Sequence, residues 1–518
     1  MLRNCLNLKL IPGSRPGPVR ALMVAWVLTV SGCAAGPDFT RPVPPPATRY
    51  TADTLRGEGA SADGQVQHIA LGQNVQSAWW TLFRSNAIDE LVTQAVDHNR
   101  TLAASMATLA QAQELALARA GSQFPQVGLT AGAGRQQYGK EFLGPIGIPP
   151  FTYFSVGPTV SYTLDYTGGV ARSVEQQYAL AQVEREQLDA AYLAITGQAV
   201  MQALTIASIR AQIATIETIL AQDRDNLRLV QTAFDDGSVA REDVVSAQSQ
   251  IANDMTLLPP LRQELAEARH ALSVVLGRAP ADHLPDDVDL SHITLPLQVP
   301  VSVPSELAHR RPDILAAEAR LHAATSAVGV AQSNLYPKIQ LTASVGQQSL
   351  KTGQLFDSAN TAWSIISGLT APIFDGGTLR AEKRAAVDAM HASAASYEQT
   401  VLEAFAQVAD LLEGLDHDAE QLDAQDHAQQ AAQSSLDLAR ISYKEGSAGV
   451  LLVLDAERSY QHARLGYVRA VAQRYLDTVQ LFLALGATSP SASLGAAFSQ
   501  SPPARDTVRQ RSESSDVL

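Results

Sequence analysis

A change of hydrophobic period inside one continuous stretch constrains this chain more than any other feature. Segments 338–346 and 363–371 alternate apolar and polar residues, and after Asp375-Gly376-Gly377 apolar residues recur about every 3.5 positions. Alternation is typical of a strand, whereas the longer period is that of a helix packed along another helix. The stretch therefore predicts two strands, one very long helix over 378–445 and, after a glycine-containing break, another long helix over 450–486.

The first half of the chain carries the same pattern. Segments 126–135 and 154–164 alternate, and residues 170–236 contain one glycine and no proline. In that long segment Ile206, Ile209, Ile213, Ile216 and Leu220 step by three and four residues, as in the seam of a coiled coil. The corresponding seam in the second half is longer and continues through Val408, Leu411 and Leu415.

The two halves also match residue by residue. Residues 118–131 align with 330–343, and each half is expected to run helix, strand, strand, long helix, turn, helix. We therefore expect an internally duplicated protomer, with a first repeat over 79–277, a Pro-rich linker over 278–304 and a second repeat over 305–486. The shorter helix that ends the first repeat should be interrupted at Pro259-Pro260.

The N-terminus has the features of a secretion signal. Residues 1–32 combine four basic residues with an apolar run over 21–30, and Val30-Ser31-Gly32-Cys33 closes them. This ending resembles the lipobox of bacterial lipoproteins, which implies cleavage before Cys33 and lipidation of its thiol. An ordinary signal peptide with a chance cysteine is the alternative. Ala34, rather than an aspartate, suits sorting to the outer membrane.

The rest of the terminal regions is predicted to lack regular structure. Residues 33–78 form a proline-rich tether, and residues 487–518 form a disordered tail rich in Ser, Pro and Arg. The full chain has a net charge of −14, and loss of the signal peptide makes it about −18. A surface this acidic argues against nucleic acid as a partner. With Cys5 removed and Cys33 lipidated, no disulfide is expected.

Four short strands cannot close a barrel by themselves. Lipid offers no hydrogen bonds to an open sheet edge, and the smallest membrane barrels have about eight strands. Several identical chains would therefore have to share one barrel, in a ring whose copy number the sequence leaves open. The alternative is a soluble pair of hairpins buried under helices. The predicted fold class is an α+β membrane protein made mainly of long helices, with four transmembrane strands per chain.

Several motifs resemble those of the TolC-like outer membrane factors, and in particular the NodT/OprM-type efflux lipoproteins of resistance–nodulation–division pumps. The resemblance covers roughly residues 33–486. It rests on the following segments: Cys33-Ala34-Ala35-Gly36-Pro37-Asp38-Phe39, Trp79-Trp80, Arg310-Arg311-Pro312-Asp313-Ile314, Tyr336-Pro337-Lys338-Ile339 and Leu452-Val453-Leu454-Asp455-Ala456-Glu457.

The resemblance implies an assembly and a set of partners. A homotrimer would build a shared twelve-strand barrel in the outer membrane and a helical barrel through the periplasm. An equatorial belt would come from residues 60–90, 278–310 and the C-terminal region. The partners would be outer-membrane lipid, a periplasmic adaptor (membrane fusion protein) and an inner-membrane resistance–nodulation–division pump.

The sequence contains no recognisable catalytic or metal-binding constellation. His-Glu-x-x-His, Gly-x-Ser-x-Gly and phosphate-cradling glycine motifs are missing, and the 11 histidines are scattered. Asp286, Asp287 and Asp289 lie in the Pro-rich linker, where a solvated turn is the simpler interpretation. We therefore predict that the protein is not an enzyme and needs no cofactor or metal.

The last long helix carries the candidate gate. Leu451, Asp455 and Arg458 fall on one helical face, while Leu454 is expected to continue the packing seam. In a ring of copies, Leu451 would form an apolar constriction and Asp455 an acidic one. The resemblance implies that the matching residues form the periplasmic gate, although Leu452 replaces an aspartate found in TolC. The alternative is a surface ion pair worth under about 1 kcal/mol.

Two glycine turns are expected at the same end of the molecule. They contain Gly237 and Ser238 in the first half and Gly446 and Ser447 in the second. Glycine permits the left-handed backbone of a tight helix–helix turn. The resemblance implies that these turns also dock the adaptor.

The predicted function is the outer-membrane channel of a tripartite efflux system. It would be a passive exit duct for drugs or other small toxic compounds, opened by an iris-like shift of the helices. Type I protein secretion, heavy-metal export and a non-conducting coiled-coil envelope protein are the alternatives.

Overall fold

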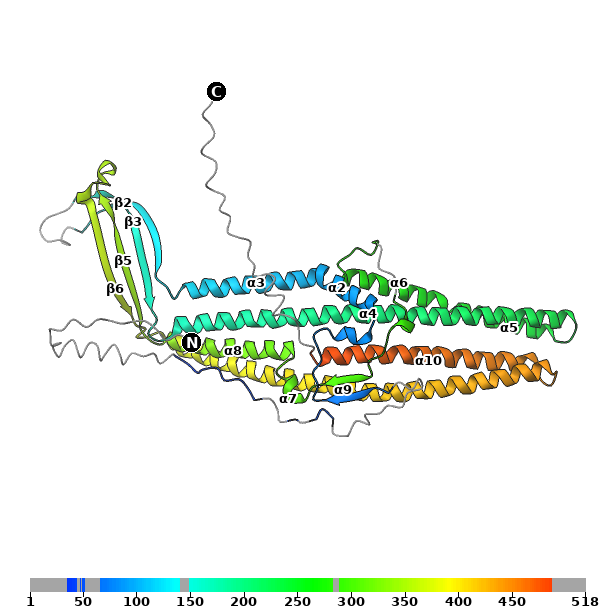
Figure 1. The fold of residues 1–518 in the computed structure, drawn as a ribbon. Helices are drawn as coiled ribbons and strands as arrows, with labels where there is room; N and C mark the ends of the chain where they lie inside the picture. The colour runs from blue at the N-terminus through cyan, green and yellow to red at the C-terminus, as the bar shows by residue number, and fades with distance from the viewer. Residues whose placement is uncertain are drawn as a thin grey trace, which may run out of the picture. The chain divides into compact units, whose positions relative to one another are not determined.

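The computed structural model describes residues 35–43, 47, 49–51, 66–139, 149–282 and 288–486. They belong to two compact units (Figure 1). The sheet unit comprises residues up to Arg41, Ala112–Ala181 and Ala319–Ala394, and the helical unit comprises the remainder. Both units combine segments from both halves of the sequence. The predicted signal peptide, Cys33 and the predicted tail lie outside the described residues.

The sheet unit contains a four-stranded antiparallel sheet. Its strands follow the order β2-β3-β5-β6. Each of the four alternating segments of the sequence forms one of these strands, with ends shifted by a few residues: β2 spans Gln126–Gln136, β3 Phe151–Leu164, β5 Lys338–Ser349 and β6 Thr361–Thr370.

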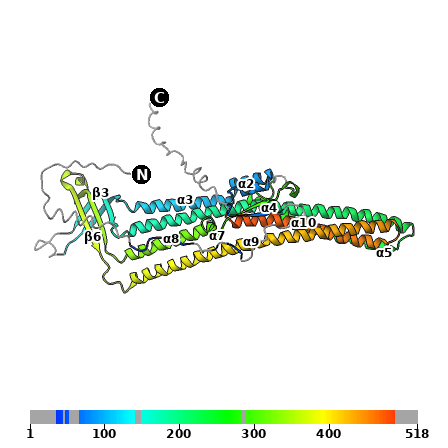
Figure 2. The same ribbon diagram turned by 60° about the horizontal axis from the view of Figure 1, so that its bottom comes forward.

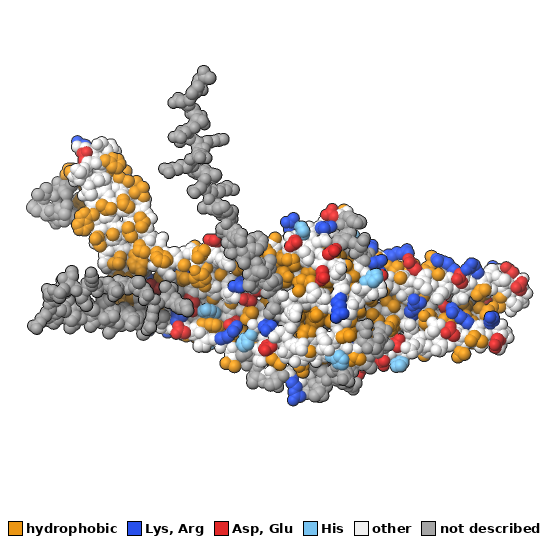
Figure 3. All heavy atoms as spheres, in the orientation of Figure 1, with side chains coloured by type: hydrophobic (Ala, Val, Ile, Leu, Met, Phe, Trp, Pro, Cys, Tyr) orange, Lys and Arg blue, Asp and Glu red, His pale blue; other side chains and the backbone are white. Residues whose placement is uncertain are grey.

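The strand register places most of the apolar side chains of the sheet on one face. Val127 pairs with Val160, Val160 with Ala343, and Ala343 with Ile365, so these residues share one face. Leu129 and Ile365 on this face are 76% and 77% exposed. Figure 3 shows apolar side chains gathered over the strands. The opposite face carries mainly Gly, Ser, Thr and Gln, with apolar exceptions that include Tyr153 and Ile366. It includes a Ser344–Ser364 hydroxyl bond of 2.8 Å.

Long helices follow the strand pairs. α4 (Gly169–Asp235) and α9 (Thr378–Lys444) contain 67 residues each, so each is on the order of 100 Å long. Each strand pair is preceded by a helix of 22 residues, α3 (Arg100–Gly121) or α8 (Pro312–Ser333). By length and composition α4 could cross a membrane, but 67% of its apolar window is buried inside the fold, as in a core helix.

In the helical unit, the parts of α4 and α9 from Gln182 and Ala395 onward pack with shorter helices. These are α2 (Asn86–His98), α5 (Arg241–Met255), α6 (Leu258–Val275) and α10 (Val450–Ala484), and Figures 1 and 2 show α9 beside α10. Pro259 and Pro260 open α6, where a proline costs no helical hydrogen bond. The predicted seam of α4 is buried apart from the half-buried Ile213.

The seam of α9 departs from its prediction after Val408. Leu412 and Leu415 are buried, whereas Leu411 is only half-buried. An α-helix has 3.6 residues per turn, so a strict 3.5 repeat drifts around its surface unless the helices supercoil to follow it. The buried stripe therefore passes through Leu412 in place of Leu411 before it reaches Leu415.

A small parallel sheet lies in the helical unit. β1 (His68–Leu71) pairs with β4 (Gln298–Val301), and the short helices η2 (Leu290–His292) and α7 (Pro304–Leu307) flank β4. Residues 278–304 therefore hold packed structure where the sequence predicts a linker. Val299 and Val301 in β4 are fully buried.

An aromatic cluster forms the centre of the helical unit. η1 (Trp79–Phe83) contributes Trp79 and Phe83, and both rings contact Phe482 of α10 with centroids 5.8 and 6.3 Å apart. All three side chains are fully buried. The cluster ties the N-terminal part of the unit to its last helix.

Replacing Phe482 by alanine should therefore leave a cavity that costs about 3–5 kcal/mol. The measurement is the denaturant midpoint of the helical circular dichroism signal of the protein in detergent. Phe356→Ala, at a ring that is 78% exposed, is the control and should change stability by less than about 0.5 kcal/mol. Equal effects of the two changes would contradict the assignment of this core.

Candidate functional site

The two glycine turns have the same backbone construction. Gly237 follows α4 with φ +72°, and Gly446 follows α9 with φ +73°. The Ser238 N–H donates to the carbonyl of Ala233 at 2.8 Å, and the Ser447 N–H donates to that of Ser442 at 2.9 Å. Each serine hydroxyl donates to the same carbonyl as its own N–H. Glycine supplies the left-handed residue that such a helix ending requires.

A small apolar core places the two turns side by side. It consists of residues from the ends of α4 and α9 and the starts of α5 and α10: buried Val230, Val244 and Val450, with half-buried Leu227, Phe234, Val239 and Tyr443 packed around them. Figures 1 and 2 show both turns at the same end of the helical unit. An open apolar groove beside them is lined by Leu229, Val230, Tyr443, Val450, Val453 and Leu454.

The three candidate gate residues lie on the exposed face of α10, next to this core. Leu451 is 56% exposed, and the side chains of Asp455 and Arg458 are each 64% exposed. The Arg458 guanidinium forms an ion pair with Asp455. Leu454, which was expected in the seam, is half-buried, and Val453 is the buried residue instead.

On the opposite face of α10, a buried polar network holds the helix in place. Glu457 is 1% exposed and accepts hydrogen bonds from Arg440 of α9 at 2.9 Å and Asn226 of α4 at 3.3 Å. One turn later, the Gln461 amide donates to Asp223 of α4 at 3.1 Å. This network is not among the features predicted from the sequence. Its signal was available, because Glu457 and Gln461 continue the seam begun by Val450 and Val453.

Two aspartates in the helical unit have raised pKa values, and each lies beside a second carboxyl group. The pKa of Asp223 is raised to about 7, chiefly by burial and then by the neighbouring Asp254, while Gln461 opposes the shift. Burial and then the adjacent Asp477 raise the pKa of Asp418 to about 8, against the effect of Arg474. In each pair the second carboxylate disfavours ionisation of the first, because two like charges close together repel.

Metal binding finds no structural support in the described part of the chain. No group of three or more His, Cys, Asp or Glu side chains there could hold a metal ion. Asp289 accepts hydrogen bonds from the backbone N–H and hydroxyl of Ser291, which lowers its pKa. Asp286 and Asp287 lie outside the described residues.

Comparison with known proteins decides the class of molecule. The family model described as outer membrane efflux protein matches residues 91–278 and 303–487. The chain belongs to this family. It is therefore an outer-membrane channel of an efflux system, in a family of transport proteins rather than enzymes. This confirms the predicted family, function and outer-membrane location.

Individual relatives resemble the chain over nearly their whole length. The pyoverdine export outer membrane protein OpmQ of Pseudomonas putida is 30% identical over 79% of this chain and 87% of its own. The cation efflux system protein CusC of Escherichia coli (strain K12) is 27% identical over 90% and 99%, respectively. The solved outer-membrane channel OprN superposes with a TM-score of 0.80 at 27% identity, covering 88% of this chain and 99% of OprN.

The buried carboxyl pairs should make the helical unit less stable as pH rises. An acid whose folded-state pKa lies above its unfolded value of 3.8 binds its proton more tightly when folded. The stabilisation that comes from this tighter proton binding is greatest at low pH. It is lost as pH rises through about 7 for Asp223 and about 8 for Asp418. The thermal midpoint in detergent, measured from pH 5 to pH 9, should fall across this window.

Asp223→Asn and Asp418→Asn should each flatten that dependence, because an amide keeps the shape of the side chain and cannot ionise. Asp225→Asn is the matched control, since its side chain lies two residues away on α4 and is 65% exposed. If the thermal midpoint of Asp225→Asn depended on pH as weakly as that of Asp223→Asn, the role given to burial would be contradicted.

Proposed function

We propose that this protein works as a homotrimer and is the passive outer-membrane exit duct of a tripartite efflux system. One observation carries the proposal: the sheet is apolar on one face and polar on the other, and its outer strands, β2 and β6, each pair on one side only. An apolar face fits lipid, and a polar face fits a water-filled interior.

The unpaired strands support assembly of several chains into one barrel. Backbone groups along β2 and β6 would be unsatisfied in lipid, where no water reaches them. Pairing β2 of one copy with β6 of the next removes every edge. Three copies of a four-stranded sheet would give a barrel of twelve strands, and the long helices would continue it as a periplasmic tunnel.

Matching order in the two halves supports an internal duplication within each protomer. The elements α3, β2, β3 and α4 are followed later by α8, β5, β6 and α9 in the same order. We assign the repeats to 79–277 and 305–486, joined by residues 278–304. With two similar strand–helix modules in each chain, a trimer would be built of six similar modules around its axis.

Partners follow from the position of the glycine turns. Gly237, Ser238, Gly446 and Ser447 form one exposed end, beside the apolar groove, and this end would receive the helical hairpins of a periplasmic adaptor. The adaptor would join the channel to an inner-membrane resistance–nodulation–division pump. Lipidation of Cys33 after removal of residues 1–32 would anchor each chain in outer-membrane lipid.

The gate would be formed by the exposed face of α10. Around a threefold axis, Leu451 would give an apolar ring and Asp455 an acidic ring, and Arg458 would hold the acidic ring through its ion pair. An iris-like shift of the helix pairs 376–445 and 450–486 would widen both rings. The acidic ring favours passage of cations in the closed state.

Small toxic organic compounds are the proposed substrates, and metal cations are the second candidate. The likeness to CusC, which is named a cation efflux system protein, is the reason for considering metal cations. Deletion of the gene should sensitise cells to organic drugs and dyes. Sensitivity to transition-metal salts alone would favour the cation alternative.

Removing the gate ion pair should raise single-channel conductance several-fold and weaken cation preference. The change is Asp455→Ala with Arg458→Ala, measured in planar bilayers. Asp225→Ala with Arg228→Ala is the control, because this pair has the same spacing on α4 and is similarly exposed. If conductance and cation preference match those of the wild type, Asp455 and Arg458 do not form the gate.

The mature protein purified in detergent should have the mass of three chains by light scattering. Unpaired strand edges make a separate chain unfavourable in a micelle, as they do in lipid. A correctly processed sample that stays a stable monomer would contradict the shared barrel.

A further inference from the structure

The first described residues of the chain are bound to the start of two helices of the sheet unit. Ala35 is 6% exposed, and its N–H donates to the carbonyl of Thr167 at 2.8 Å. Its carbonyl accepts a hydrogen bond from Nε of Arg172 at 3.3 Å. Thr167 lies between the end of β3 and the start of α4. The backbone is thus held on both sides at one residue.

Close contact between two glycines fixes the next residue. Gly36 has φ +89°, and a Cβ added to it would lie 2.4 Å from the Cα of Gly329 in α8. A Cβ added to Gly329 would lie 2.6 Å from the carbonyl oxygen of Ala35 and 2.8 Å from Cγ of Arg172. Neither position has room for a side chain while residues 35–36 stay in place.

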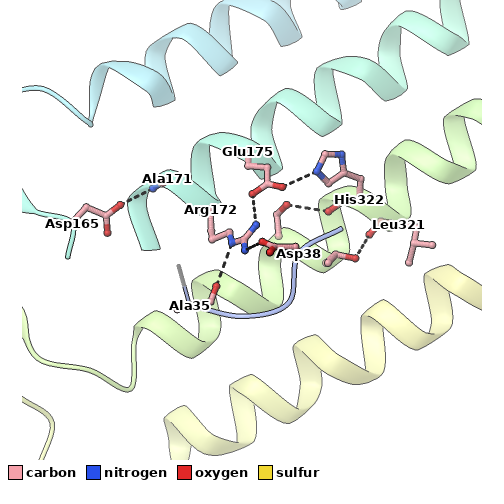
Figure 4. A network of polar contacts seen from close by, with 10 residues as sticks. Ala35, Asp38, Asp165, Ala171, Arg172, Glu175, Leu321 and His322 are labelled. Carbon is pink, nitrogen blue, oxygen red and sulfur yellow. Dashed lines mark hydrogen bonds and ion pairs between the residues drawn. The ribbon is translucent and has the colours of Figure 1, made fainter. Parts of the chain in front are cut away.

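An ionic chain joins the segment to both helices (Figure 4). The Arg172 side chain is 7% exposed and forms ion pairs with Asp38 and, at 2.7 Å, with Glu175. Glu175 also contacts Nε2 of His322 in α8 at 2.8 Å. Burial alone would raise the pKa of Glu175, but the hydrogen bonds to His322 and Arg172 lower it overall.

Phe39 completes the attachment. Its ring stacks on His322 with centroids 4.4 Å apart and an interplanar angle of 16°. The same histidine therefore contacts Phe39 through its face and Glu175 through its edge. Backbone bonds, glycine packing, charge and ring stacking thus hold four of the five residues from Ala35 to Phe39.

We propose that residues 35–39 form an N-terminal latch, closed over α4 and α8, that fixes where the lipid-bearing end of the chain meets the membrane. Cys33 precedes Ala35 by two residues, so its Cα lies within about 7 Å of that of Ala35. The attachment point is then held at the junction of β3 and α4 by protein contacts rather than by a free tether. The position of the lipid rests on the proposed lipidation of Cys33, whereas the latch itself does not.

Gly329→Ala is a sharp test of the latch. Alanine is a better helix former than glycine, so α8 itself should tolerate the change. The added methyl group meets only atoms of Ala35 and Arg172 among its nearest neighbours. Gly414→Ala in α9 is the matched control, because a Cβ there meets nothing within 4 Å.

A nitroxide label on Thr40→Cys reports the state of the latch. The position is exposed and follows Phe39 directly, and the chain's natural cysteines are only Cys5 and Cys33. In the purified mature protein, from which residues 1–32 with Cys5 have been removed, the spectrum should show an immobilised label. Gly329→Ala should convert most of the signal to the mobile component, as should Asp38→Asn combined with Phe39→Ala, while Gly414→Ala should leave the spectrum unchanged.

A mobile label in the otherwise unchanged protein, or no response to either set of changes, would overturn the latch. Failure of the lipidation proposal gives a different result, because a free Cys33 would take up a second label per chain. Collisional relaxation of the nitroxide by oxygen, which is soluble in lipid, and by a water-soluble nickel chelate then tests the membrane position. The latched label should stay at one interfacial depth, and Gly329→Ala should shift it toward water.

Discussion

The hydrogen-bonding demand of the backbone is the constraint on which the rest of this structure depends. A sheet of four strands has two edges, and in lipid the amide and carbonyl groups along each edge would have no hydrogen-bond partners. In a helix the same groups bond to one another within the chain. The 67-residue helices α4 and α9 therefore need no partner strand to satisfy their backbone. In the proposed trimer, neighbouring copies supply the missing partners of the two edge strands.

Polar groups inside the helical unit serve a different purpose from its apolar seam. The seam in α4 and α9 would pack almost equally well after small rotations or sliding of the helices. Glu457, held by Arg440 and Asn226, fits only one register of α10, because a shift would leave a buried charge without partners. Buried carboxyl pairs add the same kind of specificity. The buried polar contacts of α10 thus position the exposed Asp455 on its opposite side.

Much of this arrangement could be predicted from the sequence, because period and glycine placement act locally. The four strands, the two longest helices and both turns follow from alternation, from the 3.5 repeat and from Gly237 and Gly446. β4 could not be predicted, since Pro300 hides the alternation of Val299 and Val301 in an edge strand. Leu412 replaces Leu411 in the seam because helical drift depends on the partner helix. The contacts of Arg172 join residues far apart in the chain, which no local pattern reveals.

The polar face of the sheet has a consequence for what passes over it. It consists largely of glycines, glutamines and short hydroxyl side chains, and some of the hydroxyls bond to one another, such as Ser344 with Ser364 and Thr130 with Thr159. Hydroxyls already engaged with neighbours offer a solute weak, interchangeable contacts. In the proposed barrel, a wall of this kind would hold no single compound strongly, so dissimilar compounds could share one route.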